Sequence, residues 1–180
     1  GRTFLTFGFT KGADYRAVNL KSDGLKTLFD VERKDKGILS INLAMPGAHN
    51  VLNALAVIAL ADHLGVNDHA LRSSLAQFQG VGRRFQLVGT IYKNGQEVPV
   101  IDDYGHHPRE LEVTFNAIRG AYPGKRLVCV FQPHRYSRTR DLFDEFVSVL
   151  TVVDELVLLP VFGAGEQPIV GAESKDIARS

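Results

Sequence analysis

In the second half of the chain, strand-like and helix-like segments alternate, and this alternation restricts the possible folds more than any other pattern. Apolar runs suited to strands occupy 126–131 and 156–161, and segments of helical spacing occupy 108–119 and 140–150. A further helix is expected to begin after Ser174. Such alternation is typical of a parallel sheet covered by helices. The sequence therefore predicts an α/β fold.

The first half of the chain follows a different order, with strands before helices. Short extended runs come first, at 3–7, 15–20, 27–31 and 38–43, and segments of helical spacing follow at 47–64 and 68–78. The pattern changes at Gly80-Val81-Gly82. A β-hairpin is expected after that point, because Asn94-Gly95 joins two strand-like runs and both residues tolerate the positive φ angles of a tight turn. We therefore expect two domains, at 1–80 and 81–180.

Composition excludes several classes of protein. Apolar residues make up 44% of the chain and charged residues 23%, as in ordinary globular domains. A net charge of +1 argues against nonspecific nucleic-acid binding, and the longest apolar stretch, 51–61, is too short for a membrane span. Cys129 is the single cysteine, which predicts a reducing, cytoplasmic location. Both ends of the chain read as interrupted elements, which indicates a fragment.

Two asparagines lie near the start of the helix expected at 47–64. Asn50 and Asn53 are three residues apart, so we expect them on one helical face, where their amides suit the edge of a nucleobase. The helix N-terminus adds favourable potential for phosphate. In the structural alternative, Asn50 caps the helix and Asn53 bonds to backbone.

Gly82-Arg83-Arg84-Phe85 lies at the expected domain boundary. Paired guanidinium groups bind phosphate from two sides, and ligand clefts often lie between domains. A single arginine at this place is equally well explained as an exposed linker residue. The binding role is favoured because the two arginines lie together at the expected domain boundary.

The run Asp102-Asp103-Tyr104-Gly105-His106-His107-Pro108 joins an expected strand to an expected helix. Loops at the carboxyl ends of strands are where open α/β sheets bind ligands. The carboxylates could hold ribose hydroxyls or Mg²⁺, and the imidazoles could contact substrate or orient a water. Adjacent ligands in one loop do not match the usual zinc spacings, so no resident metal site is predicted. Helix capping by His107 is the structural alternative.

The run Phe131-Gln132-Pro133-His134-Arg135-Tyr136-Ser137-Arg138-Thr139-Arg140 carries three arginines ahead of the helix expected at 140–150. Cations are disfavoured at a helix N-terminus, so these arginines are expected to hold an anion. Arg135 and Arg138 could bind a carboxylate or phosphate in a bidentate manner. The loop at 163–166 gives a weaker signal. The chain contains no G-x-x-x-x-G-K-[ST] phosphate loop, so we expect only part of a nucleotide site.

Together these motifs resemble the Mur ligase family over essentially the whole chain. Residues 47–54 look like the adenine-side helix of the family, and 82–85 look like the junction that carries its ATP-contacting arginine, here Arg84. The resemblance implies that 1–80 form the last part of a central α/β ATPase domain. It also implies that 81–180 form a truncated, Rossmann-like C-terminal domain that binds an amino acid.

The loops at 102–108 and 134–140 are most similar to the alanine-adding branch of the family. The resemblance implies an amide-bond-forming ligase of peptidoglycan precursor synthesis that uses ATP and Mg²⁺. Its substrates would be UDP-N-acetylmuramate and L-alanine, joined through an acyl phosphate. The N-terminal and remaining central parts of the same chain would be needed for activity, so the fragment alone is expected to be inactive.

The resemblance also implies roles for individual residues. The nucleotide side comprises His49, Asn50, Asn53, Arg84 and Asp103. The substrate side comprises Tyr104, His134, Arg135 and Arg138, and the catalytic group comprises His106, His107 and Arg138. Two alternatives stay open: a related ligase that recycles a tripeptide onto the same sugar nucleotide, and a non-catalytic module that binds nucleotides or anions.

Overall fold

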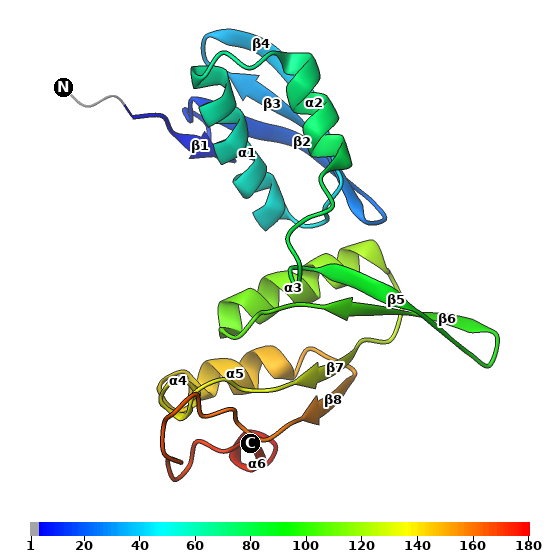
Figure 1. The fold of residues 1–180 in the computed structure, drawn as a ribbon, viewed down its shortest axis with the longest axis vertical. Helices are drawn as coiled ribbons and strands as arrows, with labels where there is room; N and C mark the ends of the chain where they lie inside the picture. The colour runs from blue at the N-terminus through cyan, green and yellow to red at the C-terminus, as the bar shows by residue number, and fades with distance from the viewer. Residues whose placement is uncertain (1–3) are drawn as a thin grey trace. The chain divides into compact units, whose positions relative to one another are not determined.

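The computed structural model describes residues 4–180, which divide into two compact units (Figure 1). The first unit extends to Gly82 and includes Gly120–Pro123, and the second comprises Arg83–Arg119 and Gly124–Ser180. Each unit has its own hydrophobic core. The helices in the described part of the chain are too short or too polar to cross a membrane.

The first unit is a four-stranded sheet with two helices. Its elements are β1 (Phe7–Gly8), β2 (Tyr15–Asp23), β3 (Lys26–Arg33), β4 (Lys36–Leu43), α1 (Ala48–His63) and α2 (Asp68–Gln77). The strands pair in the order β1-β2-β3-β4, with β1 parallel to β2 and the other pairs antiparallel. The strands therefore precede the helices in this unit, as the sequence predicts.

The core of the first unit lies between one face of this sheet and the two helices (Figure 1). Alternate residues of β3 and β4 are buried, because successive side chains of a strand point to opposite faces. Val31, Leu39, Leu55 and Ile58 are fully buried at this interface. The helical spacing of the apolar residues in α1 thus places them against the sheet.

β1 is shorter than the strand predicted at 3–7. Thr3 lies outside the described residues, and only Phe7–Gly8 pair with β2. Phe4 is 80% exposed and Leu5 45% exposed, so the apolar run that suggested a strand is not buried along its length. An apolar run forms a strand only where a neighbouring strand supplies hydrogen-bond partners.

The second unit combines a hairpin, a parallel strand pair and four helices. Its elements are β5 (Gln86–Lys93), β6 (Gln96–Asp102), α3 (Pro108–Ala121), β7 (Val128–Phe131), α4 (Tyr136–Asp141), α5 (Phe143–Leu150), β8 (Glu155–Leu158) and α6 (Ser174–Ile177). β7 and β8 pair in parallel, and β5 and β6 are antiparallel. The core includes Leu111, Phe115, Phe131 and Phe146. The predicted α/β class is confirmed.

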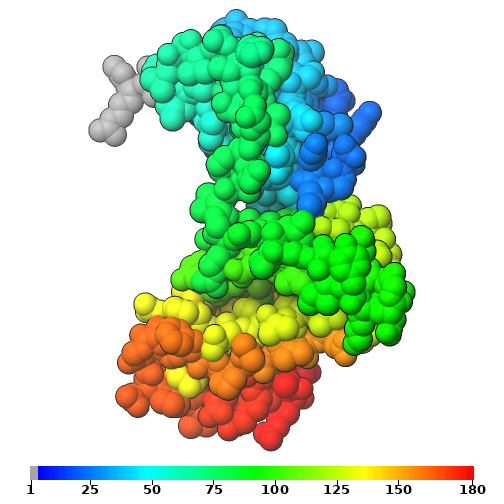
Figure 2. Space-filling view, turned by 45° about the vertical axis from the view of Figure 1, so that its right-hand side comes forward, coloured from blue at the N-terminus to red at the C-terminus, as the bar shows by residue number. Residues whose placement is uncertain are grey.

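The hairpin forms at the predicted turn. Asn94 has a φ of 52° and Gly95 a φ of 76°, as a tight two-residue turn requires. All eight residues of β5 are exposed, and the hairpin forms part of the surface coloured green in Figure 2.

The helix predicted at 140–150 is wrong in its start and its continuity. The structure has two helices, α4 and α5, and Leu142 between them has a φ of −118°. The fully buried residues Thr139 of α4 and Phe146 of α5 anchor the two segments separately. Few apolar residues mark α4 in the sequence, so its helical pattern is weak.

Candidate functional site

The asparagines of α1 differ in their environment. Asn50 is 6% exposed, and its side-chain amide donates a hydrogen bond of 2.8 Å to the carbonyl oxygen of Pro46. Asn53, one turn further along, is exposed, and His49 is half-buried. The residue at the helix cap is Gly47 rather than Asn50. Asn50 therefore fixes the entry of the chain into α1, and Asn53 is the amide that faces solvent.

The junction at Arg83-Arg84-Phe85 has an unusual backbone. Arg83 has a φ of 58° and Phe85 a φ of 49°, in the left-handed region that non-glycine residues rarely adopt. Hydrogen bonds hold this conformation: Arg83 N donates to Gln86 Oε1 at 2.8 Å, and Tyr104 N donates to the Arg83 carbonyl at 2.7 Å. Backbone strain of this kind concentrates at functional sites.

Asp103 connects this junction to the loop that follows β6. One carboxylate oxygen accepts a hydrogen bond of 2.8 Å from Phe85 N, and the other accepts one of 2.7 Å from Gly105 N. The neighbouring Asp102 pairs with Arg83 at 3.3 Å. Both oxygens of Asp103 are thus engaged by backbone amides, which makes this carboxylate the link between the two loops.

The hydrogen-bond partners of the two histidines in this loop assign different tautomers to their neutral rings. His107 Nδ1 accepts a hydrogen bond of 3.2 Å from Arg109 N, which assigns the proton of the neutral ring to Nε2. His106 Nδ1 lies 3.0 Å from the carbonyl oxygen of Tyr104, which can only accept, and this contact assigns the proton of the neutral ring to Nδ1. His106 therefore presents Nε2 as a proton acceptor, whereas His107 caps α3.

A series of rings joins the two candidate loops of the second unit. The centroids of Tyr104 and His106 are 5.4 Å apart, those of His106 and His134 6.0 Å, and those of His134 and Phe162 5.4 Å. The Arg83 guanidinium lies 4.9 Å from the centroid of the Tyr104 ring, within cation–π range. The motifs at 102–108 and 134–138, well separated in sequence, thus lie next to each other in the structure.

The arginines of the second loop lie differently from the sequence prediction. Because α4 begins at Tyr136, Arg138 and Arg140 lie in its last turn, where the helix dipole favours cations. The predicted penalty for a cation at a helix N-terminus is therefore wrong for Arg138 and Arg140, whereas Arg135 does lie at the N-cap of α4. Arg138 is half-buried and donates to the His134 carbonyl at 3.1 Å. Arg135 has a φ of 73°, a third strained residue at this site.

Two carboxylates that sequence reasoning did not assign support these loops. Glu166 accepts hydrogen bonds from Ser137 N at 2.9 Å and from Ser137 Oγ at 2.7 Å, and lies 3.8 Å from Arg135. Glu166 therefore supplies the negative charge at the start of α4. Glu110 lies beside His106 and Arg84. It lies in the first turn of α3, where acidic residues are common, and this is the signal that the sequence does contain.

The surroundings of His134 favour the neutral form of its imidazole at pH 7. Burial lowers the pKa of its imidazole below the ordinary value of 6.5, and the positive charges of Arg138, of His106 when it is protonated, and of Arg135 lower it further, against a smaller opposing effect of Glu166. Its Nδ1 lies 3.5 Å from Arg138 Nη1, which suits a neutral ring that accepts a hydrogen bond.

We expect Arg138→Ala to raise the pKa of His134, because the substitution removes a neighbouring positive charge and a donor that favours the neutral ring. Titration of the His134 ring protons by NMR measures the change. Arg140→Ala, at an exposed position paired with Asp141, should leave this pKa unchanged. A His134 pKa that falls or stays constant in Arg138→Ala would contradict this electrostatic account.

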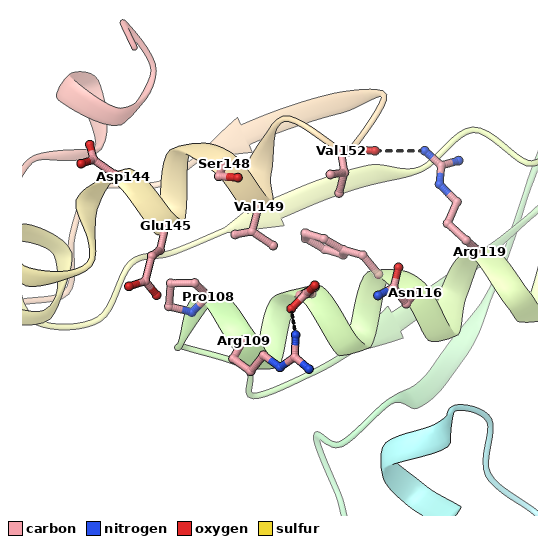
Figure 3. Close-up of a pocket in the computed structure, with 11 residues that line it drawn as sticks. Pro108, Arg109, Asn116, Arg119, Asp144, Glu145, Ser148, Val149 and Val152 are labelled. Atoms are coloured by element: carbon pink, nitrogen blue, oxygen red, sulfur yellow. Dashed lines mark hydrogen bonds and ion pairs between the residues drawn. The ribbon is translucent and has the colours of Figure 1, made fainter. Parts of the chain in front are cut away.

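A groove of about 570 Å³ lies between α3 and α5 (Figure 3). Phe115 and Val149 contribute apolar walls, and Arg109 and Arg119 lie along α3. Arg119 donates to the Val152 carbonyl at 3.2 Å. None of the residues with a predicted functional role lines this groove. In the second unit, the candidate chemistry lies instead in the loops around Arg84, His106 and His134.

Two family models cover most of the chain. The model described as the Mur ligase middle domain matches residues 1–61, and the model described as the Mur ligase glutamate ligase domain matches residues 83–180. Across its full 180 residues, the chain is 54% identical to a UDP-N-acetylmuramate--L-alanine ligase from Psychrobacter sp. (strain PRwf-1). It spans 38% of the length of that relative.

Solved structures show the same relationship. The chain matches UDP-N-acetylmuramate-alanine ligase MurC from Thermotoga maritima with a TM-score of 0.69 and 30% identity, over 86% of this chain and 39% of that one. A murein peptide ligase from Psychrobacter arcticus matches with a TM-score of 0.55 and 26% identity, over 85% and 31% of the two chains. Because the glutamate ligase domain model alone matches more than half of the sequence, the chain belongs to the Mur ligase family.

Proposed function

We propose that this chain is part of an ATP-dependent ligase that joins L-alanine to the lactyl carboxylate of UDP-N-acetylmuramate in peptidoglycan precursor synthesis. The observation that carries the proposal is the 54% identity, over all 180 residues, to a UDP-N-acetylmuramate--L-alanine ligase. Identity to the murein peptide ligase is 26%, which favours alanine over a tripeptide as the acceptor. Because the reaction consumes ATP, we place it in the cytoplasm.

The proposed reaction has two steps. An oxygen of the lactyl carboxylate attacks the γ-phosphorus of ATP, ADP leaves, and an acyl phosphate forms. The neutral amine of L-alanine then attacks the carbonyl carbon, and the tetrahedral intermediate collapses with loss of inorganic phosphate. The protein contributes groups that stabilise the negative charge developing in each step. It also contributes a base that takes a proton from the ammonium group of L-alanine.

His106 is the proposed base for the alanine ammonium group. Its Nδ1 proton is engaged by the Tyr104 carbonyl, which leaves Nε2 to accept a proton. His107 does not suit this role, because its Nδ1 is occupied by Arg109 N and its Nε2 carries the proton. We therefore assign His107 to the placement of the loop.

Arg138, with His134 and Arg135, is proposed to hold the carboxylate of L-alanine. Arg138 is half-buried, where a charge-assisted hydrogen bond is stronger than at the surface. Arg135 lies near Glu166, so part of its charge is already balanced. Arg138 is therefore the principal carboxylate ligand in this proposal, and Tyr104 borders the same site.

Arg84 is the proposed phosphate ligand of the second unit, and His49, Asn50 and Asn53 are the proposed nucleotide contacts of the first. The exposed amide of Asn53 suits direct contact, whereas Asn50 acts through the helix start that it fixes. Asp103 acts through the strained junction that it holds next to Arg84.

Mg²⁺ accompanies ATP in the proposed reaction. Residues 4–180 contain no group of three or more His, Cys, Asp or Glu side chains arranged to hold a metal ion. The carboxylates of Asp102 and Asp103 are engaged by Arg83 and by backbone amides. We therefore assign no Mg²⁺ ligand to these residues.

Phosphate release by the full-length protein tests the proposal. With ATP, Mg²⁺ and UDP-N-acetylmuramate present, we expect release that depends on L-alanine and is much slower with glycine, L-serine or the cell-wall tripeptide. Release only with the tripeptide would assign the chain to a recycling ligase. A folded, full-length protein that is inactive with every acceptor would leave a nucleotide- or anion-binding module.

A further inference from the structure

Glu110, in the first turn of α3, makes more contacts with the candidate site than any assigned carboxylate. Its Oε2 accepts hydrogen bonds from His106 N at 2.9 Å and from His107 N at 3.3 Å. Oε1 lies 3.4 Å from Arg84 Nη1. One side chain thus links the junction arginine to the backbone of the histidine loop.

These contacts cap the start of α3. His107 Nδ1 accepts a hydrogen bond from Arg109 N, and Glu110 Oε2 accepts one from His107 N, so two backbone donors at the start of the helix are satisfied. Glu110 Oε2 also lies 3.6 Å from His106 Nδ1, on the side of the ring that carries the proton. A carboxylate there favours the tautomer that leaves Nε2 available.

The surroundings of Glu110 favour its ionised form. Burial alone raises the pKa of its carboxyl group, but the hydrogen bond from His106 N, the charge of His106 when it is protonated, and the hydrogen bond and charge of Arg84 bring the pKa below its usual value. The ion pair with Arg84 is long, and its side chains are 46% and 34% exposed, so it orients Arg84 more than it stabilises the fold.

We propose that Glu110 is a positioning residue for the ligase reaction, acting through two neighbours: Oε2 fixes the His106-His107 loop, and Oε1 holds Arg84, the proposed phosphate ligand, in place. The inference rests on the proposed function, because it assigns Arg84 and His106 to that reaction. It adds a residue that neither binds substrate nor reacts.

Two substitutions in the full-length enzyme separate the two actions. Glu110→Gln keeps an oxygen that accepts from the loop amides and removes the charge that attracts Arg84. Glu110→Ala removes both. Glu112 is the matched control, because it lies on the same helix, is exposed, and pairs with Arg109 rather than with the site.

We expect Glu110→Ala to lower kcat about 10- to 100-fold, as small displacements of reacting groups do. Hydrogen exchange at the amides of 106 and 107 should become faster in this variant. Glu110→Gln should keep near-native exchange and kcat and raise the KM for ATP about 2- to 5-fold, the range of an exposed ion pair. Glu112→Ala should change each quantity by less than about 2-fold.

A double substitution distinguishes positioning from a merely structural role. If Glu110 acts through His106, then His106→Ala costs less in the Glu110→Ala background than in the wild-type enzyme. Fully additive losses, an unchanged kcat in Glu110→Ala, or equal losses in Glu112→Ala would overturn the proposal.

If the proposed ligase function is wrong, the experiments give a result that differs from failure of the Glu110 proposal alone. A wild-type enzyme without alanine-dependent turnover would refute the ligase reaction and, with it, the catalytic part of this inference. The two contacts would still be tested by hydrogen exchange at 106 and 107 and by ATP titration of the Glu110→Gln variant. Unchanged exchange in Glu110→Ala together with unchanged ATP affinity in Glu110→Gln would refute the positioning role itself.

Discussion

Arg138→Ala in the full-length enzyme is expected to raise the KM for L-alanine about 100-fold, while the KM for ATP changes less than about 3-fold. A 100-fold change corresponds to about 2.7 kcal/mol, near the lower end of the roughly 2–5 kcal/mol that removing one partner of a hydrogen-bonded charge pair costs. Arg138 is half-buried and held by the His134 carbonyl, so its guanidinium is already oriented. Steady-state kinetics with each substrate varied in turn measures both constants.

Arg140→Ala is the matched control for this prediction. Arg140 lies on the same short helix, is exposed, and pairs with its neighbour Asp141. Its loss should leave both constants nearly unchanged. If Arg138→Ala instead raised the KM for ATP and spared that for alanine, the loop would belong to the nucleotide and the assignment of the carboxylate site would fail.

Arg33→Met is expected to lower the free energy of unfolding of the first unit by about 3–5 kcal/mol. The side chains of Arg33 and Asp62 are 4% and 2% exposed, and Arg33 also makes two hydrogen bonds, at 2.7 and 2.9 Å, to Asp68. Removing Arg33 leaves the buried carboxylate of Asp62 with Lys36 alone, at 2.8 Å, and leaves Asp68 without its guanidinium partner, which is destabilising. The change is measured by hydrogen exchange: the amides of α1 should lose protection at a lower urea concentration in Arg33→Met than in the unmodified protein.

The exposed pair of Arg16 and Glu32 provides the comparison. Arg16→Met removes an ion pair of 3.0 Å from the same sheet, but its side chains are 28% and 47% exposed, so we expect a loss below about 1 kcal/mol. Asp62→Asn should recover part of the stability lost in Arg33→Met. Equal losses at Arg33 and Arg16 would show that burial does not determine the cost.

The parts of the fold that follow from local pattern could be predicted from the sequence. Asn94-Gly95 determined the hairpin through two positive φ angles, and the helical spacing of Val51, Leu55 and Ile58 placed α1 against a sheet. The start of α4 could not be predicted in this way. It is stabilised by Glu166, which lies 29 residues from Ser137, and no local pattern reports such a contact.

The sequence could predict which residues belong to the candidate site, but not the different role of each residue. The motifs indicated His106, His107 and Asp103 together, but the hydrogen bonds that give them different tasks depend on Tyr104, Arg109 and Phe85 in three dimensions. Glu110 lies in the first turn of α3, where acidic residues are common, so its contact with the helix start could have been expected from the sequence. Its contact with Arg84, 26 residues away, required the structure.

Transfer of an oxygen isotope tests the central claim most directly. The full-length enzyme is supplied with UDP-N-acetylmuramate labelled with ¹⁸O at both oxygens of the lactyl carboxylate, together with ATP, Mg²⁺ and L-alanine. If an acyl phosphate forms and alanine displaces phosphate, each inorganic phosphate released carries one ¹⁸O, and the product gains one alanine. Unlabelled phosphate, or labelled phosphate formed without an alanine adduct, would contradict the proposed reaction.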